Sequence, residues 1–289
     1  MISIRDFSQR RTFVRRYFST LIIVVVAMTV VLAFWLSRQQ PNETGPWAPD
    51  QARMPRITID GSRVTIDAIR DFPPDQAPSA ANSRYIEGVF DLDQLDSVWF
   101  VLVPFGATWR GPAHSFISFG FSDGRYLAVS VEARRERDEP YRLIAGMLRQ
   151  YELIYVIGEE RDLIGRRVMQ DGGDVYLYRM ATQPASIRTV LLSTLRRADQ
   201  LRTNPEFYNT VTNSCTSNLI DQVNGLNPGS VRWDWRQYVP GYADELALEL
   251  GLLDTTESIN AARARYRINR EVSKHLHAPD FSARIRADQ

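Results

Sequence analysis

Residues 113–136, AHSFISFGFSDGRYLAVSVEARRE, carry the clearest hairpin signal in the chain. Polar and apolar residues alternate over 114–121, and the alternation resumes over 125–132. Ser-Asp-Gly at 122–124 has the composition of a tight turn between two antiparallel strands. The stretch therefore predicts a β-hairpin in the middle of the chain.

The turn also sets a register for the hairpin. In a three-residue type I turn with glycine in the left-handed position, Phe121 faces Arg125. Counting outward places His114 opposite Glu132, with both side chains on one face of the sheet. A slip of one residue would turn Glu132 to the other face and leave Ser130 or a backbone carbonyl as the partner of His114.

The flanking segments predict a strand-rich middle and a helical second half, which is an α+β class built on an antiparallel sheet with helices. Apolar alternation and turn residues indicate a hairpin at 56–69 and strands at 97–105, 151–158 and 174–180. Helical spacing and capping residues indicate helices at 139–150, 184–202, 215–223 and 244–251.

The N-terminus differs from the rest of the chain. Residues 1–17 hold five arginines and one aspartate, and 18–37 contain no charged residue. About 20 apolar residues span a bilayer as a helix, and flanking arginines stay in the cytoplasm. We therefore expect a single-pass anchor in a bacterial inner membrane, with the remainder of the chain in the periplasm. A cleaved signal peptide or a twin-arginine export signal are the alternatives, although AFWLSRQQP is a poor cleavage site.

The remaining boundaries follow from composition. Residues 38–56 are rich in Pro, Gln and Asn and predict a linker, 57–255 predict the periplasmic domain, and 256–289 predict a charged C-terminal tail. The net charge is +1, and basic and acidic residues are mixed along most of the chain. This distribution argues against a nucleic-acid binder, which would have a concentrated basic face. Residues 158–162, GEERD, predict a structural salt-bridge cluster, and the chain has no nucleotide-binding motif or metal-ligand spacing. No cofactor is expected.

The only cysteine lies in TVTNSCTSNLID, residues 210–221. Asn213 and Ser214 are good N-cap residues, so Cys215 is predicted to open a helix, where free N–H groups favour a thiolate and can hold an oxyanion. A thiol nucleophile needs a base, and of the three histidines only His114 lies in a core strand; His275 and His277 fall in the predicted tail.

These positions predict a Cys215–His114–Glu132 constellation. The alternative for each is structural: a small buried cysteine, a core histidine and a solvated ion pair. Residues that could assist the oxyanion or the substrate are Asn209, Thr210, Asn213 and Ser214, and turn or cap chemistry is their alternative role.

Four segments, 114–136, 151–167, 174–180 and 204–224, resemble the Lnb N-terminal periplasmic domain family, with similarity from about Trp47 to about Leu253. The family looks like a circularly permuted papain-like (NlpC-type) thiol fold, in which the histidine strand precedes the cysteine helix. Its founding member is a bacterial lipoprotein N-acyltransferase. The resemblance implies that Cys215 is the nucleophile, His114 the histidine and Glu132 the acidic residue of an SxE stretch.

This chain departs from the family in two ways that bear on whether it shares the acyltransferase activity. The family reads Asn-Cys-Thr-Thr where this chain has Ser-Cys-Thr-Ser at 214–217. The acyltransferase has further membrane-spanning segments after this domain, and none is expected here. The leading expectation is a membrane-anchored periplasmic thiol enzyme that transfers or hydrolyses an acyl group on a lipid or lipoprotein. The alternatives are a cell-wall (peptidoglycan) amidase or peptidase and a non-catalytic envelope binding module.

Overall fold

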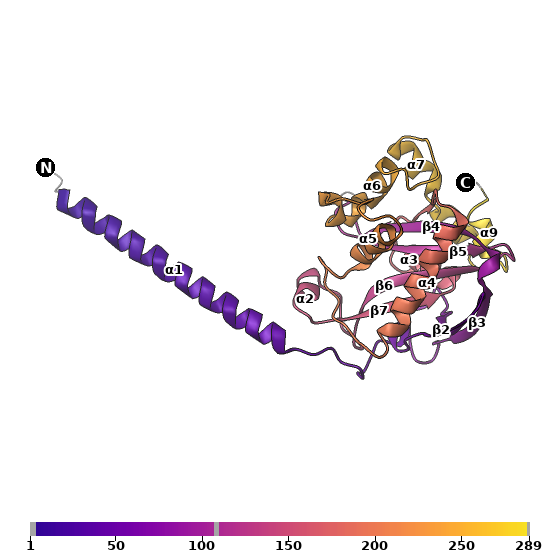
Figure 1. Cartoon of the computed structure of the whole chain (residues 1–289), viewed down its shortest axis with the longest axis horizontal. Helices are drawn as coiled ribbons and strands as arrows, with labels where there is room; N and C mark the ends of the chain where they lie inside the picture. Colours follow the sequence, from indigo (N-terminus) through magenta and orange to yellow (C-terminus); the bar gives the residue numbers. More distant parts are fainter. Residues whose placement is uncertain (1–3, 107–109, 288–289) are drawn as a thin grey trace. The chain divides into compact units, whose positions relative to one another are not determined.

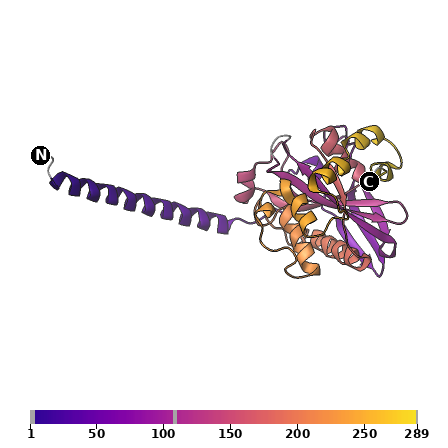
Figure 2. The same ribbon diagram turned by 90° about the horizontal axis from the view of Figure 1, so that it is seen from above.

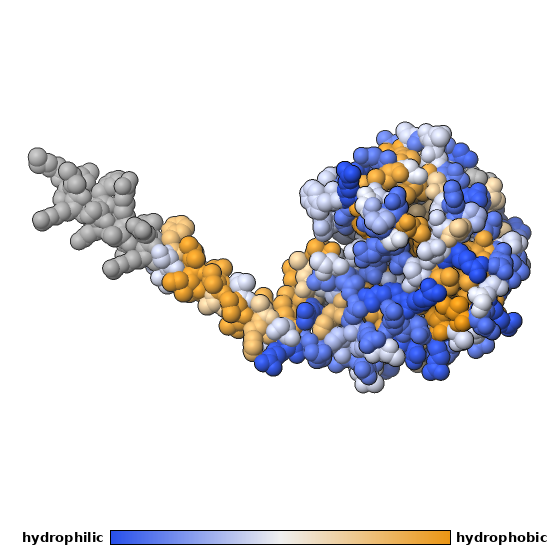
Figure 3. All heavy atoms as spheres, viewed as in Figure 1, coloured by the Kyte–Doolittle hydropathy of each residue, from blue (hydrophilic) through white to orange (hydrophobic). Residues whose placement is uncertain are grey.

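The computed structural model describes residues 4–106 and 110–287, in two compact units divided between Pro41 and Asn42. The first unit contains helix α1 (Ile4–Arg38). Its stretch Tyr17–Arg38 has a mean hydropathy of 2.6 and exposes its apolar side chains (Figures 1 and 3). By length and composition this helix is able to cross a membrane, which fits a single-pass membrane protein.

The second unit is built on one eight-stranded sheet in the order β1-β2-β7-β6-β5-β4-β8, with β3 paired to β2 (Figure 1). The strands are β1 (Arg56–Asp60), β2 (Arg63–Arg70), β3 (Tyr85–Asp91), β4 (Leu95–Pro104), β5 (Ala113–Phe121), β6 (Tyr126–Arg134), β7 (Glu152–Gly158) and β8 (Tyr176–Arg179). The predicted hairpin and strands are confirmed, and β3 lies in a region where the sequence pattern indicated no strand.

The sheet is mixed, which corrects the expectation of a purely antiparallel sheet. Strand β2 meets β7 in parallel through the single pair Arg70–Gly158. The register of β2 against β3 shifts between Ile66 and Ile69, and Ala68 between them has a φ of 65°. This bulge bends the end of β2, so that only its last residue reaches β7.

The central hairpin has the predicted register. The Phe121 N–H donates to the Arg125 carbonyl at 3.0 Å, and the Gly124 N–H donates to the Phe121 carbonyl at 2.9 Å. Gly124 has a φ of 85°, the left-handed conformation that the turn requires. Regular pairing runs from Gly120–Tyr126 to Ile117–Val129. Beyond that pair the two strands are no longer joined by a regular ladder, which is where the site described below begins.

Helices cover both faces of the sheet (Figure 2). Apolar residues of α4 and α5 pack on the face that carries Ile117 and Phe119, and those of α3, α8 and α9 pack on the face that carries Phe116. The helices are α2 (Leu143–Met147), α3 (Glu160–Met169), α4 (Pro184–Gln200), α5 (Cys215–Leu226), α6 (Ala243–Glu249), α7 (Ile259–Tyr266), α8 (Asn269–His275) and α9 (Phe281–Arg284). The predicted helices are confirmed at α2, α4, α5 and α6.

The C-terminal segment differs from the predicted charged tail. It forms α7, α8 and α9, and Val272 and Phe281 are buried in the core on the α3 face. The apolar residues 268, 272 and 276 recur every four positions and make one narrow stripe among charged neighbours. Because most residues around this stripe are charged or polar, the composition of the segment indicated a tail instead of packed helices. His277 is exposed, at 76% of its side chain, whereas His275 is largely covered beside Glu271.

The predicted linker is also partly folded onto the domain. Trp47 is buried beneath the Arg134 guanidinium, and the Ala48 N–H donates to the Arg135 carbonyl at 2.9 Å. Asp50 and Gln51 lie in a short 3-10 helix and are both buried. The domain therefore begins before residue 57, because these side chains satisfy polar groups of β6 and α3.

Candidate active site

Helix α5 begins at Cys215, as the sequence predicts. Ser214 is the N-cap, and it forms a reciprocal capping box with Ser217: the Ser214 N–H donates to Ser217 Oγ at 2.8 Å, and the Ser217 N–H points back to Ser214 Oγ at 3.5 Å. This arrangement fixes Cys215 in the first turn, where backbone N–H groups have no partner within the helix.

A buried amide fastens α5 to the sheet. Tyr155 Oη on β7 donates to Asn218 Oδ1 at 2.7 Å. Asn218 Nδ2 in turn donates to the Ser214 carbonyl at 2.9 Å and to Asn213 Oδ1 at 3.0 Å. These contacts determine how far the start of α5, and so Cys215, lies from the strands.

The structure brings Cys215, His114 and Glu132 to the wall of one cavity of about 570 Å³. Cys215 belongs to the core on the α4–α5 face, whereas His114 and Glu132 lie on the α3 face. They meet at the end of the hairpin where the regular ladder has stopped. Exposed apolar side chains among its lining residues are Phe105, Leu143, Met147 and Tyr238, and the basic side chains of Arg135, Arg166 and Arg167 also line it.

His114 reaches Glu132 through Ser130. His114 Nε2 lies 2.7 Å from Ser130 Oγ, which donates to Glu132 Oε1 at 2.9 Å, while His114 Nε2 and Glu132 Oε1 are 3.8 Å apart. Ser130 and Glu132 are alternate residues of β6 and share one face. From the sequence, Ser130 and Glu132 were alternative partners of His114, whereas in the structure both take part, with Ser130 between the other two.

This chain of contacts defines the tautomer of the imidazole. Ser130 has one hydroxyl proton, and the carboxylate of Glu132 only accepts, so that proton points to Glu132. The Ser130 oxygen must then accept a proton from His114 Nε2. The Nδ1 atom of His114 is left with its lone pair, which is the form that can remove a proton from a thiol.

Charges around Glu132 determine the protonation of both groups. Burial alone would raise the pKa of Glu132, but Arg167 and Arg70 outweigh it, and the pKa lies far below its usual range. Arg167 Nη2 and Gln51 Nε2 donate to its two oxygens at 3.0 and 2.9 Å. Burial, followed by repulsion from Arg167, lowers the pKa of His114 from 6.5 to about 3. At neutral pH the site therefore holds a carboxylate and a neutral imidazole.

The thiol itself makes no hydrogen bond to the imidazole within the described part of the chain. Its nearest polar contact is Thr216 Oγ1, 3.9 Å from Cys215 Sγ. Tyr208 lies beside the thiol, and burial, followed by the charge of Cys215, raises the pKa of its phenol far above 10. The Tyr208 hydroxyl therefore remains a proton donor, in contact with Tyr141 Oη at 3.3 Å.

The weaker site candidates separate into two groups. Asn209 Oδ1 accepts from the backbone of the following turn, and Asn213 Nδ2 donates to nearby chain, so both side chains have turn and cap roles. Thr210 and Ser214 line the cavity. The Thr210 hydroxyl donates to the Leu143 carbonyl at 2.9 Å, which joins the loop before α5 to α2.

Four residues of this site were not predicted from the sequence: Gln51, Tyr141, Arg167 and Tyr208. Gln51 lies in a segment with linker composition, and Arg167 lies on a helix that the sequence pattern left unassigned. Neither has a local signal, because each reaches Glu132 only through tertiary packing. Tyr208 lies six residues before Ser214, in a segment without regular periodicity.

Comparison with known proteins identifies the family. The profile of the Lnb N-terminal periplasmic domain matches residues 81–241, more than half of the chain, and this span includes His114, Glu132 and Cys215. The chain belongs to this family. No curated protein and no solved structure matches it significantly.

The Lnb domain depends on residues outside the matched span. Gln51 precedes it and binds Glu132, and Arg286 follows it and pairs with Glu160. Asp162 pairs with Arg70 at 2.8 Å in the interior. The salt-bridge cluster predicted for 158–162 is thus confirmed, with partners far away in sequence. Within residues 4–106 and 110–287, no three His, Cys, Asp or Glu side chains are grouped to hold a metal ion.

Proposed function

We propose that this Lnb domain is a thiol enzyme that transfers or hydrolyses acyl groups, with Cys215 as nucleophile, His114 as base and Glu132 as the group that orients His114. The observation that carries the proposal is the shared cavity of Cys215 and the His114–Ser130–Glu132 chain. We also propose that the fold is a permuted papain-like one, since the histidine strand β5 precedes the cysteine helix α5.

The chemistry follows from the tautomer. Cys215 Sγ attacks the carbonyl carbon of an ester or amide while its proton passes to His114 Nδ1. The leaving alcohol or amine takes that proton, and a thioester remains on Cys215. An amine or water then attacks the thioester carbon and gives a proton to His114 Nδ1. The acyl group passes to the amine or water, the C–S bond breaks, and His114 passes this second proton to Sγ, which restores the thiol. The N–H groups at the start of α5 and the Tyr208 hydroxyl are placed to stabilise the oxyanion.

The charge state favours a general-base mechanism over a resting thiolate–imidazolium pair. Burial and Arg167 hold the pKa of His114 at about 3, so the resting imidazole is neutral. The Glu132 carboxylate becomes useful when His114 gains a proton during the reaction, because the imidazolium is then stabilised through Ser130. Thiol and imidazole are expected to approach each other when the substrate is bound.

We propose a lipid or lipoprotein as substrate, at the periplasmic surface of the inner membrane. The apolar helix Tyr17–Arg38 would tether the domain there, with the arginine-rich residues 1–17 in the cytoplasm. Exposed apolar side chains that line the cavity, among them Phe105 and Leu143, suit a substrate that is partly embedded in lipid.

The test uses the full chain in lipid nanodiscs that contain phospholipid or lipopeptide with a labelled acyl chain. We expect a hydroxylamine-sensitive label on Cys215 in the wild type and none in Cys215→Ala. Ser130→Ala is expected to slow labelling by about tenfold or more, because it breaks the path from His114 to Glu132. Label that persists in Cys215→Ala would refute the assignment.

A parallel incubation with purified peptidoglycan distinguishes the amidase alternative from the acyltransferase. Release of soluble fragments from purified peptidoglycan by the wild type, and not by Cys215→Ala, would keep the thiol chemistry and replace the substrate. An unlabelled protein that also leaves peptidoglycan intact would favour the binding-module alternative.

A further inference from the structure

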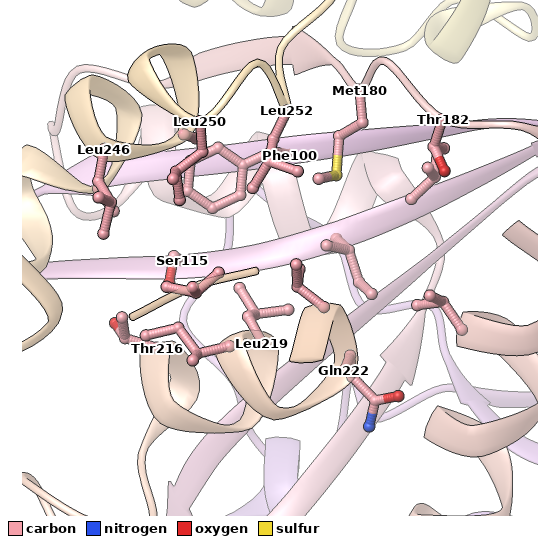
Figure 4. Close-up of a pocket in the computed structure, with 18 of the residues that line it drawn as sticks. Phe100, Ser115, Met180, Thr182, Thr216, Leu219, Gln222, Leu246, Leu250 and Leu252 are labelled. Carbon is pink, nitrogen blue, oxygen red and sulfur yellow. The ribbon is translucent and has the colours of Figure 1, made fainter. Parts of the chain in front are cut away.

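A second cavity of about 140 Å³ lies between the sheet and helices α4, α5 and α6 (Figure 4). Strands β4 and β5 supply one wall, α5 the opposite wall, and α6 with the segment after β8 the remainder. Its wall is almost entirely apolar. Its lining includes Ser115, Thr216, Leu219, Ala247 and Gln237.

The second cavity adjoins the active site. Thr216 and Gln237 line both cavities, and Thr216 directly follows the nucleophile. Ser115 directly follows His114 in β5 and points to the other face of the strand, into the second cavity. The residue that follows Cys215 in the chain therefore forms part of the wall of this apolar space.

Ser115 contributes a buried hydroxyl to the wall of this cavity. Ser115 is 1% exposed, and its hydroxyl has no hydrogen-bond partner within the described residues. A buried hydroxyl without a partner is costly, so it indicates a group that is absent here. In Figure 4, Ser115 and Thr216 face each other across the gap at one end, while Leu219 and Met180 lie further along it. The Thr216 hydroxyl lies 3.9 Å from Cys215 Sγ, so two hydroxyls at the end nearest the thiol, followed by an apolar body, have the polarity of an acyl group.

We propose that this cavity holds the hydrocarbon chain of the acyl group, with the chain's carbonyl end beside Ser115 and Thr216. Transfer of each methylene from water to such a wall favours binding by about fourfold. A stem peptide of the cell wall would place polar groups against this surface, so the cavity distinguishes an aliphatic acyl donor from a peptide. The role of the chain in catalysis rests on the proposed function, but its binding here does not.

Cys215 is the only cysteine, which gives a test that needs no catalysis. Alkyl methanethiosulfonates react with a thiolate to form an alkyl disulfide, and methanesulfinate leaves with the bonding electron pair. The full chain in nanodiscs would be treated with methyl, butyl and octyl reagents, and the rate of modification measured by intact mass. Reagents would be kept below their micelle-forming concentrations.

A reference site corrects for partition of long reagents into lipid. The double variant Cys215→Ala/Ser273→Cys carries its thiol on the exposed face of α8 instead. After division by the rate at this reference, we expect the octyl reagent to modify Cys215 about tenfold faster than the methyl reagent, or more.

Filling the cavity supplies the matched comparison. Leu219→Trp on α5 and Ala247→Phe on α6 add bulk from two different walls, and each is expected to remove the octyl preference while leaving the methyl rate within about twofold. Met169→Trp adds a bulky side chain at an exposed position on α3 and should keep the preference. If one of the two filling variants fails to fold, the other still tests the proposal.

The outcomes separate this inference from the proposed function. Equal normalised rates for methyl and octyl reagents, or a preference that survives both filling variants, would overturn the chain site even if Cys215 forms an acyl thioester. An octyl preference lost in the filling variants, together with no thioester from any donor, would support the chain site and refute the catalytic proposal.

Discussion

The pKa of His114 depends strongly on the residues that surround it. In an unfolded chain its imidazole would titrate near 6.5, but inside the domain burial and Arg167 lower its pKa to about 3. Glu132 opposes this shift and is outweighed. The folded domain therefore keeps His114 neutral and able to accept a proton. This protonation state could not be predicted from the sequence, because it depends on burial and on Arg167.

This shift predicts a pH-dependent stability. Below pH 6.5 the unfolded chain protonates His114, whereas the folded chain does so only near pH 3, so the free energy of unfolding falls as pH drops through this window. Between pH 7.5 and 5 the contribution is about 2 kcal/mol. Wild type should lose about this much more than His114→Gln, as measured by urea unfolding followed by tryptophan fluorescence.

The comparison with the variant is needed because Glu159 acts in the opposite direction. Burial, followed by Asp71 and Glu160, raises the pKa of Glu159 from 4.5 to about 7, so this group stabilises the fold as pH falls between those values. Glu159 is present in both proteins, and its contribution cancels in the difference. Equal losses in wild type and His114→Gln would show that His114 is protonated in the folded state.

At the scale of elements, the placement of α5 depends on one buried amide. Asn218 connects Tyr155 on β7 with Ser214 and Asn213 at the start of the helix. The capping box sets where α5 begins, and Asn218 sets where it lies. Both are needed, since a helix N-terminus is useful to the thiol only if it faces the cavity.

Removal of that amide should destabilise the domain. Asn218→Leu removes the acceptor of the buried Tyr155 hydroxyl, which is expected to cost about 1–3 kcal/mol. Tyr155→Phe removes the donor of the same hydrogen bond, so the double variant should lose less than the sum of the two single variants. Urea unfolding of the four proteins measures this coupling, and strict additivity would mean that the bond does not secure α5.

At the scale of the whole molecule, the C-terminal segment closes the α3 face of the sheet. Arg286 binds both oxygens of Glu160 at 2.5 and 2.8 Å, and its guanidinium lies 4.4 Å from the Trp99 ring and 3.8 Å from the Tyr126 ring. Glu160 is fully buried at the first turn of α3, the helix that also carries Arg167. The segment thereby supports the helix that holds Glu132.

The ion pair predicts a large effect of a single substitution. Arg286→Met leaves a buried carboxylate without a counter-charge and is expected to destabilise the domain by about 3–5 kcal/mol. Arg286→Met/Glu160→Met removes both charges and should recover much of that loss. The measurement is thermal or urea unfolding of the full chain, and a mild effect of the single variant would mean that the segment is dispensable.

Features that depend on residues close together in the chain could be predicted from the sequence. Alternation and a Ser-Asp-Gly turn specified the hairpin and its register to Ile117–Val129, and cap residues specified that α5 begins at Cys215. The apolar helix near the N-terminus followed from a run of uncharged residues. Each is a local preference of backbone and side chain, so a window of 10 to 20 residues contains the information.

The contacts between side chains of the site, in contrast, depend on how distant segments pack. The tertiary structure placed Ser130 between His114 and Glu132, brought Gln51 from the presumed linker to the carboxylate, and folded the presumed tail over the sheet. It also placed an apolar cavity beside Cys215. These contacts join segments far apart in the chain, and they arise from the packing of whole elements, which a local pattern does not encode.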